Sequence, residues 1–431
     1  MRLSFEQARL WSIFCLGLFW FVSVRVIGDL FASEVILLTA LPFLLVKHGK
    51  ELRNPLVKRV MLFGHLWLVS QMVTDLVRGT EIVSLAKGWL SIIFFLGGFC
   101  AMYLLVRGNE KRLNALIVGF AFGSILKGFV DPGYGFDVEP WKFGFGFPTM
   151  ILAIIVVSRG DSKKVISDQI GLVLLLLLGG LSIYLNARSL GGVLILTTLL
   201  IGLSKSRLVR QVLLERLNPA RKTGLITLVT GMILSVLVTY QWVGEEKLLP
   251  ENAQFKYEMV KSSSLGVFGI ILAGRSELLA SVPAVIDSPI IGHGSWAEDR
   301  KYRAYLYKIN AVLGLDRDED QLRRMVEEND RIPAHSHLMQ SWVWAGFLGA
   351  LFWLLILKLI GHVAVISLRY RSHLSMLALF ICIKAAWDLL FSPFSSFMRF
   401  QWDWELILML MILEENSRPI RRNEGMNESA S

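Results

Sequence analysis

Long apolar runs alternate with short polar and charged segments along most of the chain. Several runs have about 20 residues, the length that an α-helix needs to cross about 30 Å of hydrocarbon. We predict twelve membrane helices, of which the sixth, eighth and twelfth are short. They cover Leu10–Val26, Leu30–Val46, Val60–Leu76, Trp89–Val106, Leu113–Val130, Phe147–Ser158, Ile170–Leu185, Val193–Leu203, Leu225–Trp242, Leu338–Leu357, Leu374–Phe391 and Trp404–Leu413.

The composition agrees with an all-α polytopic membrane protein. Of its 431 residues, 54% are hydrophobic, and the mean hydropathy is +0.54. No small-residue cleavage site ends the first apolar run, so we expect a retained helix and not a signal peptide. Cys15, Cys100 and Cys382 lie inside apolar runs. We expect them to pack as small hydrophobic residues, without a disulfide framework or metal-ligand spacing.

Lysines and arginines gather in alternate loops. The clusters fall in residues 47–59, 107–112, 159–164, 205–222, 369–371 and 418–422. Because cytoplasmic loops of membrane proteins carry an excess of these residues, we predict that both termini are cytoplasmic and that residues 243–331 lie outside. The net charge of +10 is then mainly a sign of topology, and we do not expect nucleic-acid binding.

We divide the chain into four parts. Residues 1–242 hold membrane helices one to nine, residues 243–334 form one large periplasmic loop with short helices, residues 335–413 hold helices ten to twelve, and residues 414–431 form a cytoplasmic tail predicted to be disordered. In the loop, Ser276 can cap a helix that ends near Pro283. A second helix, Asp299–Asn310, mixes tyrosines with cations, which suits either anionic headgroups or a solvated face.

Candidate chemistry occurs at three predicted external positions. His335 and His337 stand at the start of the tenth helix, where unpaired N–H groups and the helix dipole favour an anion. Arg188 lies in a short loop and Arg275 in the large loop, and a guanidinium matches the oxygens of a diphosphate. Each position also has an ordinary explanation. The histidines can be interfacial caps, Arg188 a snorkelling side chain, and Arg275 the partner of an acid such as Glu277.

Three short motifs follow one another in a recognisable order. They are Arg188-Ser189-x-Gly191-Gly192, then Gly274-Arg275-Ser276-x-x-Leu279 followed by Pro289-Ile290-Ile291-Gly292-His293-Gly294, and finally His335-Ser336-x-x-Met339-Gln340 with Gly346 and Gly349 downstream. Together with the twelve helices and one large loop before the tenth, they resemble the O-antigen ligase and O-antigen polymerase superfamily. The chain departs from that family at the sixth helix, which opens with Gly144-Phe145-Gly146-Phe147-Pro148-Thr149 where a Gly/Asn-Pro-Asn-like stretch is common.

The resemblance implies an inverting, metal-independent glycosyltransferase of the bacterial inner membrane. Such an enzyme moves a glycan from undecaprenyl pyrophosphate to an acceptor hydroxyl on the periplasmic face. Arg188 and Arg275 would bind the pyrophosphate, and His335 would activate or orient the acceptor. His337, Ser276 and Gly191 are less certain members of the site.

The resemblance also sets the expected partners. These are the lipid-linked glycan, membrane lipids, and an acceptor that is lipid A-core for a ligase or another lipid-linked repeat unit for a polymerase. The loop placement and motif order favour the ligase slightly. We expect no cofactor, because the donor is already activated. The sequence also has no Walker A pattern, no paired acidic metal motif and no dinucleotide-binding fingerprint.

A transporter, flippase or channel is the alternative class. Glu34, Lys384 and Asp388 are ionisable residues within predicted spans, and such residues are often functional. Lys384 and Asp388 are four residues apart, so they can also simply pair on one helix. No internal repeat is visible in the span pattern, which disfavours an inverted-repeat carrier. The large loop and His335 favour the enzyme.

Overall fold

The computed structural model describes residues 4–26, 28–133, 135–158, 167–205, 219–261, 276–313, 330–370 and 372–428. About 81% of it is helical, which confirms the prediction of an all-α protein. Five helices are long and apolar enough to cross a membrane, namely Ala32–Arg53, Pro55–Arg78, Ile82–Val106, Glu110–Val130 and Phe347–Arg369. The chain is therefore suited to cross a membrane several times, while the number of twelve spans and their orientation stay predictions.

Every predicted span overlaps a helix of the structure. The bundle consists of α1 (Phe5–Leu18), α2 (Ala32–His48), α3 (Pro55–Arg78), α4 (Ile82–Val106), α5 (Glu110–Val130), α6 (Gly146–Val157), α7 (Asp168–Tyr184), α8 (Arg188–Ser204), α10 (Pro219–Glu245), α16 (His337–Ala345), α17 (Phe347–Arg369), α18 (Ser375–Phe391) and α19 (Ser396–Glu428). The tenth predicted span is thus two helices, α16 and α17. Helix α19 continues to Glu428, through most of the segment predicted as a disordered tail.

The first span ends earlier than predicted. After α1 the chain makes a 3₁₀ turn, η1 (Phe19–Phe21), and an antiparallel hairpin of β1 (Ser23–Arg25) and β2 (Asp29–Phe31). The pair Arg25–Asp29 and the positive φ of Gly28 lie in this hairpin, and both oppose a continued membrane helix. Two more short turns are η2 (Gly49–Arg53) and the π-helical turn η3 (Trp141–Phe145), which precedes α6.

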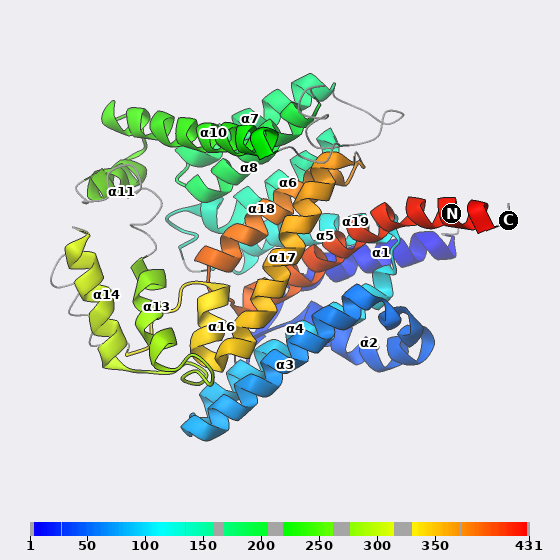
Figure 1. The fold of residues 1–431 in the computed structure, drawn as a ribbon, viewed down its shortest axis with the longest axis horizontal. Helices are drawn as coiled ribbons and strands as arrows, with labels where there is room; N and C mark the ends of the chain where they lie inside the picture. Colours follow the sequence, from blue (N-terminus) through cyan, green and yellow to red (C-terminus); the bar gives the residue numbers. More distant parts are fainter. Residues whose placement is uncertain are drawn as a thin grey trace.

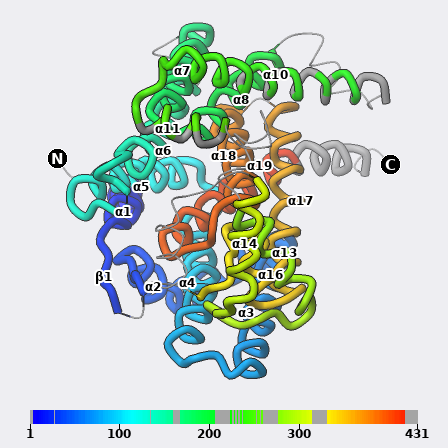
Figure 2. The backbone as a smooth tube through the Cα atoms, turned by 90° about the vertical axis from the view of Figure 1, so that its left-hand side faces the viewer, coloured from blue at the N-terminus to red at the C-terminus, as the bar shows by residue number. Residues whose placement is uncertain are grey.

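Three helices of the predicted loop gather at one end of the molecule. Helices α11 (Glu251–Lys261), α13 (Ser276–Asp287) and α14 (Arg300–Val312) lie with α16 at the end opposite the two chain termini (Figure 1). Figure 2 views the molecule from that end. Helix α14 agrees with the predicted Asp299–Asn310, and Asp299 caps it.

Within the described residues α13 runs from Ser276 to Asp287, so it passes Pro283, near which it was predicted to end. A proline inside a helix removes one hydrogen bond of the ladder. Burial of Ala284 and Val285 in a small apolar cluster with Tyr302 of α14 favours the helix beyond the proline.

The core of the bundle lies around α4 and α19. Phe95 and Phe99 of α4 and Trp402 and Trp404 of α19 have no exposed surface, and the two helices pack against each other. Residues 399–413 of α19 are buried, as expected of a helix in the centre of a bundle.

Candidate functional site

The site is organised by a break between α16 and α17. Gly346 has a φ of 70°, and a Cβ added to it would stand 1.9 Å from the carbonyl oxygen of Ile290. Glycine is therefore required there. The break leaves the carbonyls of Val343 and Trp344 outside the helical ladder, and they accept hydrogen bonds from the N–H groups of residues 293–294 at 2.7 and 3.1 Å. The turn after α13 is thereby fixed to the α16–α17 junction.

Helix α3 holds the same turn from the other side. The buried carboxylate of Asp75 accepts hydrogen bonds from the N–H of Ser295 at 2.6 Å and from the indole of Trp89 at 2.8 Å. Arg78 donates to the carbonyl of Gly292 at 2.9 Å. These polar groups find partners within the protein, so they act as an anchor. The sequence gives one signal for them, an acid and a base one turn apart at the end of the third span.

The start of α16 is fixed in the same way. The hydroxyl of Ser336 accepts a hydrogen bond from the N–H of Met339 at 3.2 Å and donates to the carbonyl of Leu389 at 2.9 Å. The amide of Gln340 exchanges two hydrogen bonds with the backbone of Phe394, at 3.1 and 2.7 Å. His335 directly precedes the cap residue Ser336, so its backbone is attached to a fixed position.

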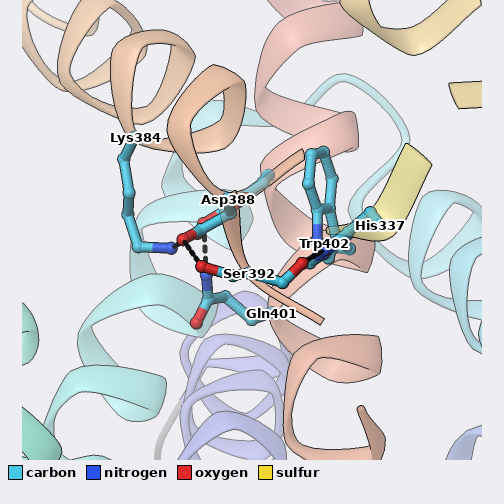
Figure 3. A network of polar contacts seen from close by, with 7 residues as sticks. His337, Lys384, Asp388, Ser392, Gln401 and Trp402 are labelled. Atoms are coloured by element: carbon cyan, nitrogen blue, oxygen red, sulfur yellow. Dashed lines mark hydrogen bonds and ion pairs between the residues drawn. The ribbon is translucent and has the colours of Figure 1, made fainter. Parts of the chain in front are cut away.

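His337 is buried among the residues that fix the start of α16. Its Nε2 accepts a hydrogen bond from the indole of Trp402 at 2.8 Å, and its Nδ1 lies 2.5 Å from the carbonyl oxygen of Ser392 (Figure 3). An indole only donates and a carbonyl only accepts, so the ring is neutral with its proton on Nδ1. Both ring nitrogens are used, which leaves neither for a substrate.

A chain of buried charges continues from His337 (Figure 3). The side chain of Ser392 donates to Asp388 at 3.1 Å, Asp388 pairs with Lys384, and the ammonium of Lys384 lies 3.7 Å from Glu405. The pairing of Lys384 with Asp388 is the ordinary alternative considered from the sequence.

A second buried pair joins α19 to α2. Arg399 binds Glu34 through two hydrogen bonds, at 2.6 and 2.8 Å. Asp403, one turn further along α19, is also buried. Sequence reasoning singled out Glu34 but missed Arg399, Asp403 and Glu405. Their signal was a set of charges next to aromatic residues, with Arg399 and Asp403 just before the twelfth predicted span and Glu405 within it.

His335 lies in a different environment. Its Nδ1 is 3.1 Å from Oε2 of Glu277, and the two side chains are 40% and 42% exposed. Glu277 lies in the first turn of α13, directly after the buried Ser276. Within the described ranges, the Nε2 of His335 has no hydrogen-bond partner. The second and third motifs of the sequence therefore meet here, although Arg275 itself lies outside the described residues.

Arg188 occupies a separate position. It is the first residue of α8, its Nη1 is 3.3 Å from the hydroxyl of Tyr240 in α10, and its guanidinium lies over the same ring at 5.5 Å. In the part of the chain that the structure describes, Arg188 makes no contact with His335 or Glu277. Gly191 faces α7, where an added Cβ would stand 2.5 Å from the carbonyl oxygen of Gly179. Gly191 thus allows α7 and α8 to pack closely.

No protein-family model and no curated protein matches the chain. Among the described residues, no group of three or more His, Cys, Asp or Glu side chains could hold a metal ion. What the site offers is an accessible imidazole with a carboxylate on one nitrogen. Such a group can accept a proton at its other nitrogen.

Proposed function

We propose that the chain is a membrane-embedded glycosyltransferase that uses a polyprenyl-pyrophosphate-linked glycan. The observation that carries this proposal is the contact between His335 and Glu277, because it brings two of the three family-like motifs into one accessible place. The transfer would take place at the end of the bundle where α13 meets α16 (Figure 1).

In this reaction His335 removes the proton of the acceptor hydroxyl at Nε2. The acceptor oxygen forms a bond to the anomeric carbon of the donor sugar, and the bond from that carbon to the diphosphate breaks. The diphosphate departs with the bonding electrons, and Arg188 and Arg275 stabilise its charge. A single displacement of this kind inverts the anomeric configuration.

We place the site on the periplasmic side of the bacterial inner membrane. The distribution of lysine and arginine over the loops supports cytoplasmic termini. Helices α11, α13 and α14 lie at the opposite end from both termini, which agrees with an external loop (Figure 1). We favour ligation to lipid A-core as the reaction, with polymerisation of repeat units as the alternative.

The test is transfer by the purified chain in detergent. Undecaprenyl-pyrophosphate-linked glycan and lipid A-core are mixed with the protein, and the glycosylated product is measured by gel and mass spectrometry. We expect product without added nucleotide. We also expect Arg188→Ala to lower the rate about 10²–10³-fold, since it removes one donor to the leaving diphosphate. Arg300→Ala is the control, because Arg300 is an exposed arginine of α14 that belongs to none of the three motifs.

One result would contradict the proposal as a whole, and a second would contradict one part of it. One is the absence of product with lipid A-core and with a second lipid-linked repeat unit as acceptor. The other, which removes only the role of Arg188, is equal activity of Arg188→Ala and Arg300→Ala. Ligase and polymerase are distinguished by deleting the gene. Loss of all lipopolysaccharide-attached polymer with long lipid-linked chains indicates a ligase, and capping with single repeats indicates a polymerase.

A carrier for lipid-linked sugars is the second candidate. It is favoured by the buried charges Lys384, Asp388 and Glu405 and by the pair Arg399–Glu34, since ionisable groups inside a bundle often mark transport paths. Proteoliposomes separate the two functions. Movement of lipid-linked glycan across the bilayer without acceptor, and without any transfer product, would support the carrier.

A further inference from the structure

We propose that Glu277 is the positioning residue of His335, so that the two side chains act as a carboxylate–imidazole pair. This inference rests on the proposed function and adds a residue to it. The carboxylate oxygen lies 3.1 Å from Nδ1, within reach of a hydrogen bond. A carboxylate in this place holds the proton on Nδ1 and directs the lone pair of Nε2 outward.

Glu277 belongs to α13, and His335 directly precedes the cap residue of α16. Helix α13 packs against α14 and α16, and its buried face includes Ser276, the residue before Glu277. At the other end of α13, Asp287 is bound by Lys301 at 2.5 Å and by Tyr302 at 2.8 Å. The start of α16 is fixed by the hydrogen bonds of Ser336. The contact of the pair therefore follows from the packing of two helices.

The exposure of the pair suits catalysis. The His335 side chain is 40% exposed, and in the proposed reaction the acceptor approaches it at Nε2. When the acceptor hydroxyl gives its proton to Nε2, the ring becomes positively charged. Glu277 stays ionised and stabilises that charge, while the acceptor oxygen bonds to the sugar carbon and the diphosphate leaves. Glu277 thus acts through His335 and exchanges no proton with the substrate.

The chain provides a matched control for this pair. His373 lies in contact with Glu110, and these side chains are 45% and 31% exposed. They lie at the ends of α5 and α18 and belong to none of the three motifs. Glu110→Gln therefore repeats the same chemical change in a similar pair outside the proposed site.

The experiment measures kcat and KM for the purified full chain with undecaprenyl-pyrophosphate-linked glycan and lipid A-core. We expect Glu277→Gln to lower kcat about 10-fold or more at an unchanged KM for the donor. Glu277→Asp, which keeps the charge, should recover part of the loss. In a His335→Ala background, Glu277→Gln should cause no further loss, because its effect passes through the imidazole. Glu110→Gln should match the unaltered chain.

Other outcomes separate the two proposals. If the unaltered chain transfers glycan and Glu277→Gln is equally active, only the role of Glu277 is overturned. The same conclusion follows if Glu277→Gln lowers the rate equally with and without His335, because that marks a purely structural effect. If Glu277→Gln does not fold, Glu277→Asp in the two backgrounds decides in the same way. Absence of transfer by the unaltered chain overturns both proposals.

Discussion

His335 and His337 are two residues apart and have opposite environments. His335 is 40% exposed and has a carboxylate on one nitrogen, whereas His337 is fully buried and has a hydrogen-bond partner on each nitrogen. The cap residue Ser336 separates them. His335 precedes the helix and contacts α13, while His337 is the first residue of α16 and contacts α17, α19 and the segment between α18 and α19. Equal side chains thus differ in what they can do because of their surroundings.

The largest expected effect is on the exposed histidine. His335→Ala should lower the transfer rate about 10²–10⁴-fold, the usual contribution of a general base. The thermal unfolding of the protein in detergent should stay unchanged, since the side chain is not packed in the core. His373→Ala, which removes another half-exposed histidine next to a glutamate, is the control. If both variants retain full activity, the proposed distinction between the two histidines is wrong.

Substitution of the buried His337 should lower the stability of the protein. His337→Ala leaves the indole of Trp402 and the carbonyl of Ser392 without partners and creates a cavity. We expect a loss of about 2–4 kcal/mol in the free energy of unfolding. Thermal unfolding and the yield of folded protein measure it. A His337→Ala variant that is as stable as the unaltered chain but inactive would show that His337, too, takes part in the chemistry.

Sequence patterns predicted the helices of this bundle better than their junctions. A long apolar run indicates a helix, because in hydrocarbon every backbone N–H and C=O group must form its hydrogen bond within the segment. The break at Gly346 was not predicted, since a glycine inside an apolar run is compatible with a continuous helix. Only the close approach of Ile290, far away in the sequence, shows why the helix stops there.

The candidate site was predictable only in part, because contacts between residues distant in sequence are not visible in the sequence. The motifs pointed to His335 and to the start of α13, but Glu277 was considered only as a partner of Arg275. The apolar run Trp404–Leu413 predicted the last span, but nothing in it showed that Arg399 and Asp403, just before the run, and Glu405, within it, are buried. Their partners, among them Glu34, are distant in sequence and become visible only in the folded bundle.

The smallest expected effect concerns the anchor of α13. A hydrogen bond from Lys301 lowers the pKa of Asp287 below its ordinary 3.8, and the same bond raises the pKa of Lys301 above 10.5. A lowered carboxyl pKa adds stability above about pH 4 and loses it as the pH falls through the folded value. A raised lysine pKa adds stability below about pH 10 and loses it as the pH rises through the folded value. The anchor is therefore strongest between these limits.

Hydrogen exchange can compare two sets of contacts. One is the pair of Asp287 and Lys301, which fixes α13, and the other is the set of hydrogen bonds that fixes the start of α16. Between pH 5 and pH 3, after correction for the intrinsic rates, we expect protection in Ser276–Asp287 to fall slightly, because the pair of Asp287 and Lys301 is exposed and screened by water. Asp287→Asn should remove this pH dependence. The pH dependence of protection in α16 should be the same with and without Asp287→Asn, since the hydrogen bonds of Ser336 and Gln340 do not involve Asp287. If Asp287→Asn changes protection in α16 as much as in α13, the two helices open together and the exposed half of the site has no separate anchor.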